Sequence, residues 1–302
     1  MRTIRVRAVG EWGGRLLREV ESATTEAALS TFYHQRRASG HNAFRYSTRH
    51  PVRVLCAAVA VARLPLLRWR AGGGVESKVI EEALKVPLFR VLRSSWIGMS
   101  VLAVPGTQSD YLSGARKQTL RRKIRAAQRD GVTYRRIEDP VERRELLALA
   151  DRVEMEHSDP NYRNSRPQNA GILGHRFWLG GFGPSGEPLL LAVLPIANGA
   201  AYLRYFRTLG HGNTFSNARY MLSAAMVEEL RKEGVSFVFD GTPPSYLPNG
   251  LRDFQRMVGF RAMRVRLVRR SARPASGAVR QVPRAGAFAV SRQEQQEGEL
   301  IQ

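Results

Sequence analysis

Residues 204–260, which read RYFRTLGHGNTFSNARYMLSAAMVEELRKEGVSFVFDGTPPSYLPNGLRDFQRMVGF, form the most informative segment of this chain. A turn that contains two glycines follows a predicted strand, and an amphipathic helix over residues 216–233 ends at a glycine, a typical helix stop. The apolar run that follows predicts a buried strand over residues 235–240, and a short helix is expected over residues 250–258. This alternation of strands and helices predicts an α/β fold built on a mixed sheet.

The rest of the chain predicts further elements from its apolar periodicity. The second half is expected to contain a helix at 141–157 and strands at 132–137, 174–180, 187–196, 200–208 and 260–269. The first half is expected to contain helices at 11–32 and 76–86, a polar loop at 33–50, and strands at 3–9, 52–62, 64–70 and 97–104. Between them a helix is expected over residues 109–130, with a cap at Ser109-Asp110 and a stop at Gly131.

Two stretches resemble the GNAT-like acyl-CoA N-acyltransferases, in particular the branch that contains the FemABX-type peptidyltransferases. One is the segment 204–260, and the other is YLSGARKQTLRRKIRAAQRDGVTYRRI, which resembles a basic helix of that family. The resemblance implies a GNAT-like domain, a basic connecting helix, an N-terminal part that could be a degenerate second GNAT-like half, and a disordered tail. These parts are expected at residues 132–270, 109–131, 1–108 and 271–302, respectively.

The resemblance also implies an activity, the transfer of an acyl or aminoacyl group to an amine. The donor would be acyl-CoA or aminoacyl-tRNA, bound as a substrate, with no permanently bound cofactor. The acceptor would be the amine of a small molecule, a peptide or a lipid headgroup. In this fold two neighbouring parallel strands, here 200–208 and 235–240, splay apart and leave backbone N–H groups that can polarise the donor carbonyl.

Four residues are catalytic candidates on this reading. Asp240 ends a buried strand beside the expected cleft and could position the amine or accept its proton, although an Asp-Gly turn is the alternative. Tyr205 lies on the preceding strand, and Tyr246 lies in the loop PPSYLPNG. His157 belongs to an E-x-E-H-x-D cluster that matches no metal-binding spacing, so we expect no metal, and a solvated helix end is the alternative.

The segment RTLGHG at residues 207–212 matches the R-x-x-G-x-G pyrophosphate loop of CoA-dependent members of the family. Backbone amides at a helix N-terminus bind phosphate well. The resemblance therefore makes four residues candidates for binding the donor: Arg207, Gly210, His211 and Gly212. In those members the helix begins at the last glycine, whereas three residues are expected to precede a cap at Ser216 here; a plain strand-to-helix turn is the alternative.

The charge of the chain indicates a polyanionic partner. It has 48 Lys and Arg against 26 Asp and Glu, a formal net charge of +22, which favours tRNA, another nucleic acid, an anionic lipid surface or a phosphorylated substrate. GC-rich coding, which favours Arg codons, is the alternative explanation. The expected helix 109–130 carries the candidates for this contact: Arg116, Arg121, Arg122, Arg125 and Arg129. A non-catalytic protein that binds a polyanion, or a membrane-surface protein that uses residues 54–69, would fit the same charge.

The compartment follows from two further features. Cys56 is the only cysteine, so a disulfide within the chain is excluded, and its apolar neighbours predict a small buried side chain. The first residues, MRTIRVRAVGEWGG, lack the apolar stretch of a secretory signal. We therefore expect a cytoplasmic protein, with peripheral membrane contact as an open alternative.

Overall fold

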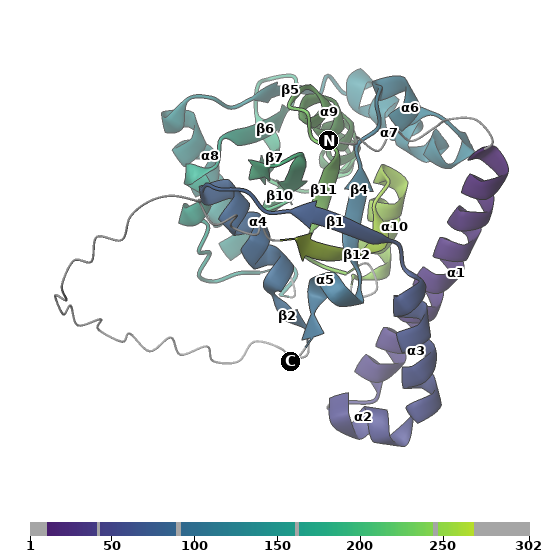
Figure 1. Cartoon of the computed structure of the whole chain (residues 1–302). Coiled ribbons are helices and arrows are strands. Elements are labelled where there is room, and N and C mark those ends of the chain that lie inside the picture. Colours follow the sequence, from purple (N-terminus) through teal and green to yellow (C-terminus); the bar gives the residue numbers. More distant parts are fainter. Residues whose placement is uncertain (1–10, 41–42, 89–91, 161–162, 244–246, 269–302) are drawn as a thin grey trace, which may run out of the picture. The chain divides into compact units, whose positions relative to one another are not determined.

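The computed structural model describes residues 11–40, 43–88, 92–160, 163–243 and 247–268 (Figure 1). The strand expected at 3–9, the tail expected at 271–302 and Tyr246 lie outside these residues. The described helices are α1 (Glu11–Ala38), α2 (Ala43–Arg49), α3 (Pro51–Arg63), α4 (Val75–Lys85), α5 (Ser94–Ile97), α6 (Gln108–Leu112), α7 (Gln118–Arg129), α8 (Pro140–Met155), α9 (Asn213–Lys232) and α10 (Asn249–Val258), with 3-10 turns η1 (Ala115–Lys117) and η2 (Ala170–Gly174).

Two larger sheets carry most of the strands. The first is mixed and has the order β1-β12-β4-β11-β9-β8, with β1 (Leu66–Arg70), β4 (Met99–Ala103), β8 (Ile196–Ala197), β9 (Ala200–Tyr202), β11 (Phe237–Asp240) and β12 (Arg261–Val268). The second is antiparallel and has the order β10-β7-β6-β5, with β5 (Thr133–Arg136), β6 (Phe177–Phe182), β7 (Pro188–Leu194) and β10 (Tyr205–Thr208). A small hairpin joins β2 (Pro87–Leu88) to β3 (Leu92–Arg93). The expected mixed α/β fold is confirmed.

The chain passes from one sheet to the other between β9 and β10. β9 runs parallel to β11 for three residues, to the pair of Tyr202 with Phe239, and the Leu203 N–H then donates to the Phe239 carbonyl at 2.8 Å. The next amide, that of Arg204, donates instead to the Val193 carbonyl of β7 at 3.1 Å, and β10 continues along β7. The strand expected at 200–208 is thus divided, and its second half diverges from β11.

Helices cover both faces of the four-stranded sheet. α9 packs in the main core with Leu179 of β6 and Leu190 of β7, while α8 packs on the other face with Trp178 and Val193. Both faces of this sheet are buried. For this reason the sequences of β6 and β7 are nearly continuous apolar runs and do not alternate between apolar and polar residues. α9 also contacts Val238 of β11, so one helix spans the junction of the two sheets.

The N-terminal 108 residues supply two strands of the first sheet. β1 pairs with β12 and β4 pairs with both β11 and β12, so this part shares a sheet with the last strands of the chain. The division of the chain at residues 108 and 132 stays a prediction.

The strand expected at 52–62 is wrong, because these residues form helix α3. Valines in the run favoured a strand, but Pro51 occupies the first helical turn, where its fixed φ and missing N–H cost nothing. Four alanines in VLCAAVAVA add helix propensity. Cys56, expected to be buried, is exposed on this helix. The polar loop expected at 33–50 is also largely helical, in α1 and α2.

The single helix expected at 109–130 is broken into α6, η1 and α7. The break lies at Gly114, whose φ of 84° suits glycine, and the cap is Thr107 rather than Ser109, because the Thr107 hydroxyl accepts from the Asp110 N–H at 3.1 Å. The expected stop is present: Gly131 follows the helix with a φ of 72°.

This break divides the basic residues into two groups. Arg121 is half-buried and donates to the carbonyls of Leu112 at 2.6 Å and Gly114 at 2.9 Å, which holds the end of α6. Four other arginines are exposed to solvent: Arg116, Arg122, Arg125 and Arg129.

Candidate active site

The Asp240 carboxyl group lies at the end of β11, beside the point where the two strands diverge. Its Oδ2 accepts from the Gln255 amide at 2.6 Å, and its Oδ1 accepts from the Thr242 N–H at 3.1 Å. The Gln255 carbonyl oxygen accepts in turn from the Ser100 hydroxyl at 2.7 Å. Because β4 supplies Ser100 and α10 supplies Gln255, three elements that are distant in sequence hold this carboxyl group.

Burial raises the pKa of Asp240 to about 6, and the hydrogen bonds from Thr242 and Gln255 offset part of that rise. A carboxyl group that exchanges its proton near this pH can accept a proton from an incoming group under cellular conditions. Raised carboxyl pKa values of this kind are common at catalytic sites. The alternative role, an Asp-Gly turn, also receives support, since the Thr242 amide bonds to the same side chain.

Sequence reasoning missed one residue of this cluster, Tyr202, whereas Arg204 was noted together with Tyr205 on the preceding strand. A Cβ atom placed on Gly241 would lie 2.8 Å from the Tyr202 hydroxyl, so this phenol reaches the turn that follows Asp240. Burial and the Asp240 charge raise the pKa of Tyr202, while the charge and hydrogen bond of Arg204 lower it. Treating residues 200–208 as one continuous strand hid Tyr202, because the chain bends after this residue and that bend determines what the side chain faces.

Aromatic rings pack between strand β10 and helix α10. Phe206 stacks on Phe254, with ring centroids 6.1 Å apart, and Tyr220 contacts Phe254 edge-on at 5.1 Å. The Arg219 guanidinium lies 4.3 Å from the Phe254 centroid. These contacts place a cation and an apolar wall beside the diverging strands.

Tyr205 lies on the opposite face of β10 from Phe206, away from this wall. Its hydroxyl donates to Glu154 Oε1 at 2.8 Å, and burial followed by the Glu154 charge raises the pKa of Tyr205. Glu154 is buried, and it also binds Arg207 at 2.8 Å and the side-chain amides of Asn164 and Asn169. The structure thus gathers Tyr205 and Arg207 around Glu154, and it does not bring Tyr205 to Asp240.

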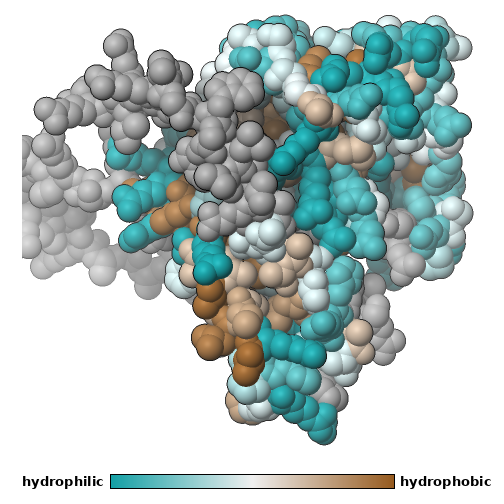
Figure 2. Space-filling view, turned by 90° about the vertical axis from the view of Figure 1, so that its right-hand side faces the viewer, coloured by the Kyte–Doolittle hydropathy of each residue, from teal (hydrophilic) through white to brown (hydrophobic). Residues whose placement is uncertain are grey.

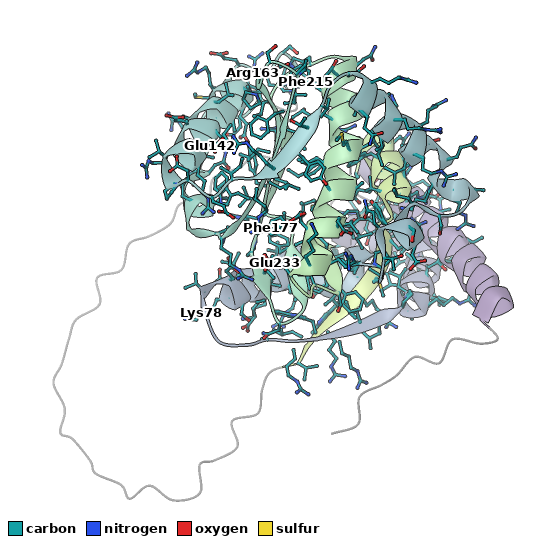
Figure 3. The ribbon with its side chains drawn as sticks, turned by 90° about the horizontal axis from the view of Figure 1, so that it is seen from above. Lys78, Glu142, Arg163, Phe177, Phe215 and Glu233 are labelled. Carbon is teal, nitrogen blue, oxygen red and sulfur yellow. The ribbon has the colours of Figure 1, made fainter. Side chains whose placement is uncertain are left out.

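His157 and His211 meet where α8 ends and α9 begins. Their rings contact edge-on with centroids 5.1 Å apart, and His157 Nδ1 accepts from the Asp159 N–H at 3.1 Å. Arg163, which donates to the His157 carbonyl at 2.9 Å, lies at the same end of the molecule as Phe215 in the first turn of α9 (Figure 3). The sequence had assigned the two histidines to different roles.

The loop RTLGHG leads directly into α9. The helix begins at Asn213, immediately after Gly212. The predicted helix start, with a cap at Ser216 and three residues between it and Gly212, is therefore wrong. Gly212 has a φ of 111°, which favours glycine, and a Cβ atom on Gly210 would clash with the Phe215 ring. A donor phosphate at this helix end would compete with Glu154 for Arg207.

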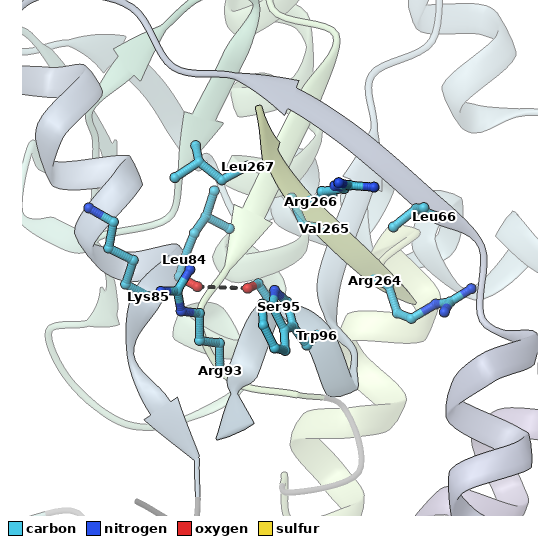
Figure 4. Close-up of a pocket in the computed structure, with 10 residues that line it drawn as sticks. All are labelled: Leu66, Leu84, Lys85, Arg93, Ser95, Trp96, Arg264, Val265, Arg266 and Leu267. Carbon is cyan, nitrogen blue, oxygen red and sulfur yellow. Dashed lines mark hydrogen bonds between the residues drawn. The ribbon is translucent and has the colours of Figure 1, made fainter. Parts of the chain in front are cut away.

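A cavity of about 430 Å³ lies elsewhere, against β1, β12, α4 and α5 (Figure 4). None of the described residues that line it carries a carboxyl group, and the Ser95 hydroxyl donates to the Leu84 carbonyl at 2.7 Å. Its charged lining residues are Lys85, Arg93, Arg264 and Arg266.

Comparison with solved structures finds several chains that resemble this one over part of its length. L-PGS from Bacillus licheniformis is 16% identical, with a TM-score of 0.42 over 55% of this chain and 59% of that one. A lysylphosphatidylglycerol synthetase candidate from Agrobacterium fabrum is 17% identical, with a TM-score of 0.39 over 55% and 58% of the two chains. FemX is 12% identical, with a TM-score of 0.40 over 55% and 59%.

The chain thus spans less than two thirds of these structures. No model of a known family and no curated protein sequence matches the chain.

We predict that Asp240→Asn changes how stability depends on pH. Because the folded-state pKa of about 6 lies above the ordinary value, the wild-type chain loses stability as pH rises through 6. The Asn side chain has no carboxyl group to ionise, so the variant does not lose stability in this way. Its free energy of unfolding minus that of wild type should therefore increase by about 1–3 kcal/mol between pH 4 and pH 7. Urea unfolding at several pH values measures this, with the exposed Asp253→Asn as control. A stability difference that is constant with pH would contradict it.

Proposed function

We propose that this chain is an N-acyltransferase that moves an acyl or aminoacyl group from acyl-CoA or aminoacyl-tRNA to an amine. The observation that carries the proposal is the parallel pairing of β9 with β11, which ends after three residues beside the Asp240 carboxyl group. β10 is the outer strand of its sheet, so along one edge its backbone groups have no strand partner among the described residues. Such an edge can bind an extended donor.

Asp240, the β10 backbone and Tyr202 have different roles in the proposed acyl transfer. Ionised Asp240 accepts a proton from the acceptor ammonium, and the neutral amine attacks the donor carbonyl carbon. A backbone N–H on the open edge of β10 stabilises the oxyanion. The C–N bond forms and the bond to the thiolate or to the ribose oxygen breaks. One of the two protons left on the nitrogen passes to the leaving group, directly or through the Tyr202 hydroxyl, while the other stays on the amide product, and Asp240 returns its proton to solvent. No permanently bound cofactor is needed.

Between the two donors, we favour aminoacyl-tRNA. Arg122, Arg125 and Arg129 are exposed and follow one another by three and four residues on α7, which places them on one face. Arginines arranged in this way suit successive phosphates of a nucleic acid. Arg207, the cation of the CoA-type loop, is paired with Glu154 instead. The acceptor amine, of a small molecule, a peptide or a lipid headgroup, stays open, and we place the reaction in the cytoplasm.

We predict that Asp240→Asn lowers turnover by about 100-fold or more, the range of a lost general base. Transfer of a labelled group from acetyl-CoA and from a mixture of charged tRNAs to a panel of amines, followed by mass spectrometry, measures this. Asp253→Asn, on the exposed side of α10, should retain wild-type turnover. If Asp240→Asn retained turnover, Asp240 would be a turn-forming residue only.

A second candidate function is a non-catalytic protein that binds a polyanion, because the exposed arginines of α7 would serve it equally well. Binding of tRNA without transfer from any donor would favour this function over the first.

We predict that replacing Arg122, Arg125 and Arg129 together by Ala weakens tRNA binding. The slope of log affinity against log salt should become shallower by about two to three, because three phosphate contacts are lost. Fluorescence anisotropy at several salt concentrations measures this. Arg121→Ala is the matched control: its guanidinium holds the end of α6, so it should lower the melting temperature and leave the slope unchanged. If the triple variant and wild type had equal salt slopes, the α7 arginines would make no phosphate contacts and would only face solvent.

A further inference from the structure

Helix α3 turns an almost wholly apolar face to solvent. Of its 13 residues, PVRVLCAAVAVAR, only Ala57 and Ala60 are buried. Val52 is 71% exposed and Leu55 65% exposed, and Val59 follows them on the same face. An apolar stripe on one exposed helix face is unusual for a surface that meets only water.

The apolar surface extends beyond α3. Phe44 on the preceding helix α2 is 80% exposed, and Figure 2 shows apolar side chains gathered in this part of the molecule. A groove of about 400 Å³ runs between α3 and α1, lined by Leu55, Cys56 and Val59 on one side and by Ala28 on the other. The surface is therefore continuous across two helices and a groove.

This surface is held firmly against the sheet. Glu26 of α1 is buried, accepts from the Ala262 N–H of β12 at 2.8 Å and lies 3.4 Å from the Arg256 guanidinium of α10. Leu29 and Tyr33 of α1 pack in one cluster with Ala57 and Ala60. The exposed residues of α3 thus belong to a fixed face.

The segment that contains α2 and α3 carries charges of one sign. Residues 27–75 contain eight arginines and no Asp, Glu or Lys. Four of these arginines are exposed on α2 and α3, among the apolar residues: Arg45, Arg49, Arg53 and Arg63. Apolar side chains flanked by arginines are the composition of helices that lie at the surface of an anionic bilayer.

We propose that α2 and α3 form a docking surface for an anionic lipid bilayer, a property separate from the proposed acyl transfer. α3 lies flat, with Val52, Leu55 and Val59 at the boundary of the acyl chains and the arginines among the headgroups. At about 20 Å it is too short to cross the hydrocarbon core, and no described helix is long and apolar enough to do so. An RNA would leave the apolar stripe in water, and a second copy would bring like charges together.

Co-sedimentation of the full chain with vesicles tests this proposal. Wild type should bind vesicles of equal parts phosphatidylglycerol and phosphatidylcholine, and bind phosphatidylcholine alone much more weakly. The triple change Val52→Ser, Leu55→Ser and Val59→Ser should weaken binding by about tenfold or more, because three apolar groups no longer leave water. The control is a triple change of exposed valines elsewhere, Val75→Ser, Val86→Ser and Val141→Ser, and it should bind as wild type does.

Three results would overturn the proposal: no binding of wild type to the mixed vesicles, equal binding by the α3 triple variant, or a wild-type dimer in light scattering that this variant abolishes. The last result would assign the face to a second copy. Phe44→Ser provides a single, less severe change on the same face, and it should weaken vesicle binding while leaving the melting temperature unchanged.

Discussion

The site depends on a single switch of hydrogen-bond partner along the backbone. The Leu203 amide bonds to β11 and the next amide, that of Arg204, bonds to β7, so adjacent residues belong to different sheets. From this point β10 and β11 diverge, and the Asp240 side chain lies at the end of β11 beside the divergence. Phe206 of β10, Phe254 of α10 and Arg219 of α9 pack against one another near the diverging strands.

The sequence was sufficient to predict the parts of this arrangement that depend on local pattern. The apolar run before Asp240 predicts a buried strand, and Gly131 and Gly234 mark the ends of helices correctly. The helical structure of α3 was not predictable in this way, because its valines favour a strand while its alanines favour a helix. The role of Arg121 also escaped prediction, since its partners are carbonyls across a helix break that Gly114 creates.

Long-range contacts explain the remaining omissions in the site. Tyr205 was a candidate because it lies on the right strand, but Glu154, which lies 51 residues earlier, binds its hydroxyl on the opposite face. Ser100 and Gln255 reach Asp240 from elements that only the folded sheet brings together. Gln255 contributes a neutral amide, so no cation from this position stabilises the Asp240 charge.

The pH dependence of acyl transfer tests most directly whether Asp240 is the proton acceptor. The account predicts that kcat/KM falls on the acid side with an apparent pKa of about 6. Gln255→Lys places an ammonium beside the carboxylate and should move this acid limb to lower pH by about one unit or more. An acid limb at the same pH in wild type and Gln255→Lys would contradict the assignment of the proton transfer to Asp240.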